Sequence, residues 1–216
     1  MNGKKLAFYL IWLGLLSLAP ITVLKNTPIS LVVSTPVMLT GTIQRLVGLW
    51  AFTLLFTQIV LGSFMQKWTE KLGGWVFGFH VFEGLVAYVL IVVHPISFLF
   101  FNYFLGKGFD PFNVFTQACV LCPSPTELYY TLGRAAFWLL TFGVLAALFR
   151  TSTPFLRLHW RKFHILNYLA FLLVGLHSLG VGTDIGTFPF SFFHAPAIAI
   201  VLLIVVFKGI PRLSRS

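Results

Sequence analysis

The chain has 216 residues, of which 58% are hydrophobic and only 9% are charged. A soluble domain of this length does not need so much apolar surface, so the composition indicates a membrane protein in a lipid bilayer. The formal net charge of +10 would favour nucleic-acid binding in a soluble protein. Here the basic residues fall between apolar runs, which membrane topology explains, and we expect no nucleic-acid partner.

Six apolar segments are long enough to cross a bilayer, and they lie at about 6–24, 43–65, 75–100, 128–149, 162–181 and 195–210. Clusters of Pro, Gly and Asn mark the loops between them, as at 123–125 and 151–154. The first segment has the basic start of a secretory signal, but its apolar run is long for one and Pro20 follows the only suitable cleavage point. The sequence therefore predicts an all-α membrane protein, a six-transmembrane-helix bundle that forms a single domain over residues 1–216.

Lysine and arginine are distributed unequally between the two sides of this predicted topology. Eleven lie on one side, namely Lys4, Lys5, Lys67, Lys71, Arg150, Arg157, Arg161, Lys162, Lys208, Arg212 and Arg215. The other side has Lys25 and Lys107 in loops, with Arg45 and Arg134 just inside helices. Because basic loops stay in the cytoplasm, we expect both termini to be cytoplasmic in a multi-pass protein of the plasma (inner) membrane.

Four histidines stand in two pairs on the third and fifth apolar segments. His80 and His94 are 14 residues apart, and His164 and His177 are 13 residues apart. An ionisable group within a spanning helix indicates a functional site, because imidazole is costly in hydrocarbon. At 1.5 Å rise per residue the members of each pair lie roughly 20 Å apart, too far to chelate one metal. The pairing expected is across helices, His80 with His164 near the cytoplasm and His94 with His177 near the exterior.

Two imidazoles at each level suit the axial positions of a six-coordinate haem iron between helices 3 and 5. Zinc is disfavoured because neither level has the thiolates or carboxylates to complete four ligands. Bis-histidine ligation also leaves no open position on iron, which favours electron transfer over binding a substrate at the metal.

Helical phase agrees with this pattern on one helix only. On an ideal helix His80 and His94 share a face within about 40°, whereas His177 lies roughly 140° from His164. A kink or bulge, with Gly175 as the candidate place, would correct the phase. Alternatively, the two haems meet the fifth helix from different sides, and the sequence leaves both interpretations open.

The segments HVFEGLVAYVLIVVH and WRKFHILNYLAFLLVGLH resemble the third and fifth helices of the ferric reductase-like transmembrane family, which includes ferric reductases and NADPH oxidases. The shared features are a His-x3-Gly opening at His80–Gly84 and a basic residue before His164, and the resemblance covers all six helices. It implies two b-type haems, with iron held by His80 and His164 at the inner site and by His94 and His177 at the outer site.

Family members that work alone continue into a cytoplasmic flavin and NADPH domain, whereas this chain has no Gly-rich dinucleotide fingerprint after a strand. The resemblance therefore implies flavin on a separate cytoplasmic flavoprotein reductase. The exterior acceptor would be ferric iron, dioxygen or a partner protein, as for the haem subunit of the periplasmic methionine-sulfoxide reductase system. Two histidines on the third span depart from the single one expected of that subunit.

Two other functions use similar residues. Cytochrome b of respiratory complexes also has paired histidines on two helices, but six spans and the His-x3-Gly motif argue against it. A non-haem, proton-coupled transporter would use the buried histidines as a proton relay.

Several polar residues accompany the histidines. Arg45 and Arg134, near exterior helix ends, would clamp haem propionates or extend to the headgroups. Arg161 belongs to a basic cluster that would hold inner-haem propionates, dock an acidic reductase or only obey the positive-inside rule. The other members of this cluster are Arg157, His159, Trp160 and Lys162.

Glu83 is the only carboxylate deep within a span, three residues after His80. It would hydrogen-bond a ligand, relay a proton or be structural, while Gln58 is expected to bond between helices. Cys119 and Cys122 form Cys-x2-Cys-Pro in an exterior loop, where we expect a local disulfide and consider a redox-active dithiol as the alternative. His194, at the start of the last span, would bind an exterior metal or nothing, and we expect nothing.

Overall fold

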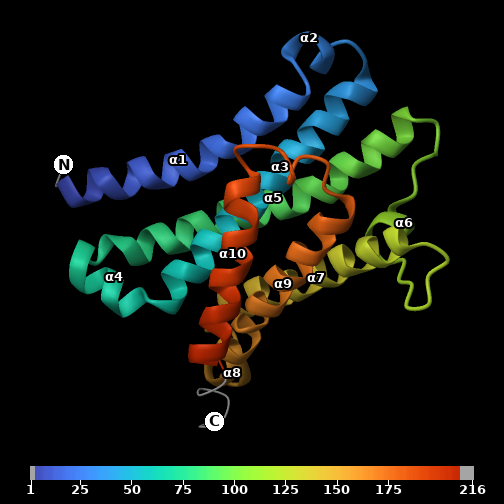
Figure 1. Cartoon of the computed structure of the whole chain (residues 1–216). Coiled ribbons are helices and arrows are strands. Elements are labelled where there is room, and N and C mark those ends of the chain that lie inside the picture. The colour runs from blue at the N-terminus through green and yellow to red at the C-terminus, as the bar shows by residue number, and fades with distance from the viewer. Residues whose placement is uncertain (1–2, 210–216) are drawn as a thin grey trace. The chain divides into compact units, whose positions relative to one another are not determined.

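The structure is a computed structural model that describes residues 3–209, and these residues form helices and loops without a strand (Figure 1). Five helices are long and apolar enough to cross a membrane, at Gly3–Asn26, Pro36–Ser63, Trp75–Phe104, Pro125–Leu148 and Pro154–Val181. A further apolar helix, Ser191–Phe207, is shorter. The all-helical, multi-pass character expected from the composition is confirmed. The last predicted span, 195–210, ends outside the described residues.

The chain folds into two compact units. One consists of Met1–Phe109 with Thr183–Ala197, and the other of Asp110–Gly182 with Ile198–Ser216. The boundary falls within α10 (Ser191–Ile204).

In the first unit the buried centre is α3 (Pro36–Ser63), of whose apolar window 61% is buried, against 17% for α1 (Gly3–Asn26) and for α5 (Trp75–Phe104). The α3 helix packs along α5 and also contacts α1 (Figure 1). Two short helices, α2 (Ile29–Val32) and α4 (Met65–Leu72), lie in the connections. Because α3 is enclosed, small residues on its surface decide how closely its neighbours approach.

In the second unit α7 (Pro125–Leu148) packs along α9 (Leu166–Val181) and contacts α8 (Pro154–His164). The short helix α6 (Pro111–Phe115) precedes α7, and α10 continues into a π-helical turn, η1 (Val205–Gly209). The two helices that carry His164 and His177 therefore both lie against α7.

Three long helices begin with proline, earlier than the sequence predicted. Pro36, Pro125 and Pro154 are the first residues of α3, α7 and α8, and the 123–125 and 151–154 stretches expected to be loops include two of these starts. Proline suits the first helical position because the N–H that it lacks has no partner there anyway. Thr153 also caps α8, where its hydroxyl accepts from the Leu156 N–H at 3.1 Å.

The fifth predicted span is two helices with a break at a single residue. The α8 helix ends at His164, α9 begins at Leu166, and Ile165 lies between them. The break is thus at Ile165, not at Gly175. A Cβ added at Gly175 would lie 2.9 Å from Cδ1 of Ile198, so this glycine instead provides room for α10. Ile165 itself keeps right-handed helical dihedral angles, φ −63° and ψ −26°, and its N–H donates to the Arg161 carbonyl at 3.1 Å.

Candidate functional site

The His94 ring lies on α5 against a glycine of α3. Its Nδ1 atom is 2.9 Å from the carbonyl oxygen of Gln44, and a Cβ added at Gly48 would lie 2.7 Å from the ring. Because a carbonyl only accepts, Nδ1 carries the hydrogen and donates it. The other ring nitrogen, Nε2, then carries the lone pair that a metal ligand needs.

His177 repeats this arrangement in the other unit. Its Nδ1 donates to the Tyr129 carbonyl on α7 at 2.9 Å, and a Cβ added at Gly133 would lie 2.6 Å from the same nitrogen. In both units the accepting carbonyl stands four residues before the glycine, one helical turn away. Two separate helix pairs thus hold an imidazole in the same tautomer by the same device.

The histidines near the other helix ends also face glycines. The His80 ring lies against Gly62, where a Cβ would be 3.3 Å from Cε1. Gly48 and Gly62 are 14 residues apart on α3, the same interval as that between His94 and His80 on α5. His164 hydrogen-bonds the backbone of Gly143 on α7, and the Asn167 amide is 3.3 Å from its Nδ1.

The close approach of the histidine rings explains why glycine occurs at Gly48 on α3 and at Gly133 on α7. All four glycines are within long apolar helices, where glycine costs roughly 0.5–1 kcal/mol relative to alanine. The ring contacts offset this cost, because any side chain at Gly48 or Gly133 would occupy the volume of the imidazole. Glycine at Gly62 allows a similar approach of the His80 ring, whereas Gly143 makes room for the Asn167 side chain and the Phe163 carbonyl.

Glu83 is 1% exposed and binds side chains of two other helices. Trp12 Nε1 of α1 donates to its Oε1 at 2.7 Å, and Gln58 Nε2 of α3 donates to its Oε2 at 2.6 Å. The Thr57 hydroxyl also bonds Oε1, and Gln58 Nε2 reaches the His80 carbonyl oxygen at 2.9 Å. Gln58 therefore bonds between α3 and α5, as expected, and it connects Glu83 with the backbone of His80.

Arg45 is part of a partly buried ion pair that the sequence reasoning missed. Its Nη1 lies 3.2 Å from both carboxylate oxygens of Asp184, and its Nη2 donates to Thr27 Oγ1 at 2.6 Å. Asn26 Nδ2 donates to the same carboxylate at 2.6 Å. The available signal was that Asp184 is one of only five acidic residues in the chain.

Arg134, next to Gly133, has a buried donor. Its Nε donates to the Val114 carbonyl at 3.3 Å and its Cζ lies 5.9 Å from the centre of the Tyr130 ring. Among the described residues its buried Nη1 has no hydrogen-bond partner. Arg161, by contrast, is exposed on α8 and stacks on Trp160 at 5.6 Å.

The remaining candidates lie apart from this arrangement. Cys119 and Cys122 are joined by a disulfide whose Cα atoms are 5.3 Å apart, and the Cys119 N–H donates to Thr131 of α7. His159 Nδ1 donates to the Phe155 carbonyl on exposed α8. His194 stacks on Phe52, with ring centres 4.9 Å apart.

Metal-ligand chemistry limits the groups that fit. Within residues 3–209 no group of three or more His, Cys, Asp or Glu side chains is arranged to hold a metal ion. Haem iron takes only two axial protein ligands, and imidazoles anchored through Nδ1 fit that role. The buried Nη1 of Arg134 fits an acidic group such as a propionate. The residues present therefore fit haem.

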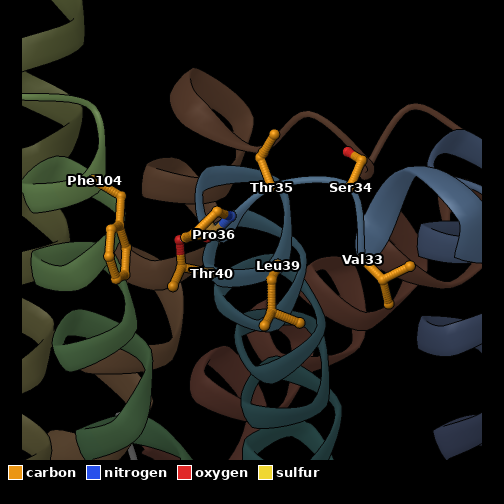
Figure 2. Close-up of a pocket in the computed structure, with 7 residues that line it drawn as sticks. All are labelled: Val33, Ser34, Thr35, Pro36, Leu39, Thr40 and Phe104. Carbon is orange, nitrogen blue, oxygen red and sulfur yellow. The ribbon is translucent and has the colours of Figure 1, made fainter.

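A cavity of about 330 Å³ lies elsewhere, at one end of α3 (Figure 2). Thr35, Pro36 and Thr40 line it, and Phe104 of α5 faces them. No charged residue lines it, so it offers no charged group for a polar substrate.

Comparisons with protein-family models, curated proteins and solved structures found no match to this chain. The function proposed below therefore rests on the residues themselves.

Proposed function

We propose that this chain is a di-haem b-type membrane cytochrome that passes electrons from a cytoplasmic donor to an extracytoplasmic acceptor. The observation that carries the proposal is the repeated histidine site. His94 and His177 lie against a glycine of a neighbouring helix and donate through Nδ1 to the carbonyl one turn before it. An axial ligand needs this tautomer, because a hydrogen on Nδ1 leaves the lone pair on Nε2 for the metal. A histidine that only packs in the core does not need its tautomer fixed in this way, and here the arrangement occurs twice.

His80 with His164, and His94 with His177, would supply the axial ligands, as their depth along the predicted spans requires. Haem held by two imidazoles supplies reversible one-electron transfer without an open coordination position. Arg134 would bind a propionate through its buried Nη1. Arg161, exposed on α8, would contact the donor protein or the lipid headgroups.

The proposed topology has six spans with both termini in the cytoplasm, which puts the His80 end of α5 on the cytoplasmic side. A cytoplasmic flavoprotein is the proposed donor, since no dinucleotide fingerprint occurs in the sequence. The proposed acceptor is ferric iron, dioxygen or a partner reductase.

A proton-relay transporter fits the histidines less well. A relay needs imidazole nitrogens that exchange protons with successive partners. The Nδ1 hydrogens of His94 and His177 are instead directed at backbone carbonyls, which accept a hydrogen bond but do not take up the proton.

The absorption spectrum of the purified protein tests the proposal. We expect Soret and α bands of low-spin haem and two haems per chain by pyridine haemochrome, and we expect His94→Ala and His80→Ala each to lose one haem. His159→Ala is the matched control, because the His159 ring stacks on Phe155 and bonds the Phe155 carbonyl within its own helix, and it should keep both haems. A protein without haem bands, or full haem content in both ligand variants, contradicts the proposal.

A further inference from the structure

We propose that two charges of opposite sign, the buried Glu83 beside His80 and the half-buried Arg134 beside His177, set a difference in reduction potential between the two haem sites that drives electrons outward. This inference rests on the proposed function and adds what makes the transfer directional. Each charge is argued below from its own unit of the structure.

An ionised Glu83 would bring a negative charge to the His80 end of α5. Each of its oxygens receives an N–H from a side chain that can only donate at that atom, Trp12 Nε1 on Oε1 and Gln58 Nε2 on Oε2. Such donors satisfy an ionised carboxylate, which has acceptors only. Among the described residues no Lys or Arg forms an ion pair with it.

A carboxylate enclosed in apolar helices needs a compensating positive charge, because the cost of burying an unpaired charge is large. An iron held by His80, one helical turn away, would supply positive charge, because the oxidised site would be more positive by one charge than the reduced site. The Glu83 carboxylate therefore stabilises the oxidised state and lowers the reduction potential of this site.

Arg134 has the opposite effect at the His177 end of α9. It follows Gly133 in the chain, and a Cβ added at Gly133 would lie 2.6 Å from Nδ1 of His177, so the Arg134 charge stands close to this site. Among the described residues Glu127 does not form an ion pair with Arg134. A cation at this place favours the reduced state, so the half-buried Arg134 would raise the reduction potential of this site.

Both charges favour electron transfer in the same direction. In the proposed topology Glu83 stands on the cytoplasmic half and Arg134 near the exterior. Electrons move toward the higher potential, so these charges favour transfer from the His80 site to the His177 site.

A spectroelectrochemical titration of the two haems tests the inference. Glu83→Gln should raise the potential of the lower-potential haem and leave the other unchanged, whereas Arg134→Gln should lower the potential of the higher-potential haem. Glu83→Asp and Arg134→Lys keep the charges and should shift the potentials less. Matched controls are Glu70→Gln and Lys107→Gln, which remove the same charges from exposed positions and should shift neither haem.

Single-haem backgrounds assign the shifts to sites. In His94→Ala, which keeps the inner haem, Glu83→Gln should raise the potential; in His80→Ala, which keeps the outer haem, it should have no effect. Infrared spectra of the wild-type protein supply a readout that does not depend on electron transfer, and should show an ionised Glu83 band that is absent from Glu83→Gln.

Two bound haems whose potentials do not respond to either charge, or respond equally to both, overturn the inference and leave the proposed function intact. A protonated Glu83 band overturns it as well. Absence of haem overturns the proposed function itself. If Glu83→Gln does not fold, the infrared band and the Arg134 variants still decide, because Arg134 lies in the other unit.

Discussion

An imidazole inside a membrane protein is stable only when its N–H finds an acceptor, since a buried unpaired donor costs about 1–3 kcal/mol. For His94 and His177 the acceptor is a helical carbonyl, of Gln44 and Tyr129. A ring reaches the backbone of a neighbouring helix only where no side chain intervenes. Glycine is therefore as much a part of each site as the histidine.

The glycine requirement gives a test at a single residue. Gly48→Ala places a methyl group 2.7 Å from the His94 ring and should move Nδ1 away from the Gln44 carbonyl. We expect loss of about half of the haem, measured by pyridine haemochrome on purified protein. Gly78→Ala is the control, because a Cβ at Gly78 on the same helix as His94 meets nothing within 4 Å. Equal haem in the two variants would show that the close approach does not matter.

The connections between helices depend on polar side chains. Arg45 of α3 holds Asp184, which is 2% exposed and follows α9, and Asn26 at the end of α1 holds the same carboxylate. The sequence suggested haem propionates or lipid headgroups for Arg45, and the structure provides an acidic partner within the chain. This ion pair fixes the segment after α9 to the first unit.

Removal of the Asp184 carboxylate tests this role. Asp184→Ala should lower the free energy of unfolding by roughly 2–3 kcal/mol, less than for a fully buried pair because the Arg45 side chain is 22% exposed. Arg45→Gln should cost a similar amount, and the double variant little more than either single one. Denaturant unfolding in detergent measures all three. A far larger loss of haem in Arg45→Gln than in Asp184→Ala would instead favour the propionate role.

The membrane topology is a property of the whole chain and has its own test. In a Cys119→Ser, Cys122→Ser background, Lys107→Cys should react with a membrane-impermeant maleimide in intact cells, whereas Ser152→Cys should react only after the membrane is opened. Both positions are exposed at helix ends, so neither thiol is shielded by packing. Labelling of Ser152→Cys in intact cells would reverse the predicted orientation.

Sequence reasoning was accurate where the property is local. The all-helical, multi-pass character follows from apolar run lengths, which do not depend on distant residues. The helices that contain the second, fourth and fifth predicted spans begin before those spans, at Pro36, Pro125 and Pro154, because proline also suits the first helical turn. The break at Ile165 carries no Gly or Pro signal, and the obvious Gly175 serves packing instead.

Hydrophobicity and spacing by themselves determined the membrane class and directed attention to the four histidines, because both are read along a single segment. The tertiary structure decided which carbonyl and which glycine serve His94 and His177, that Asp184 pairs with Arg45, and that Trp12 and Gln58 hold Glu83. These partners are dozens of residues apart in the chain. Only packing of one helix against another brings a donor to its acceptor, and no periodicity within a helix records that contact.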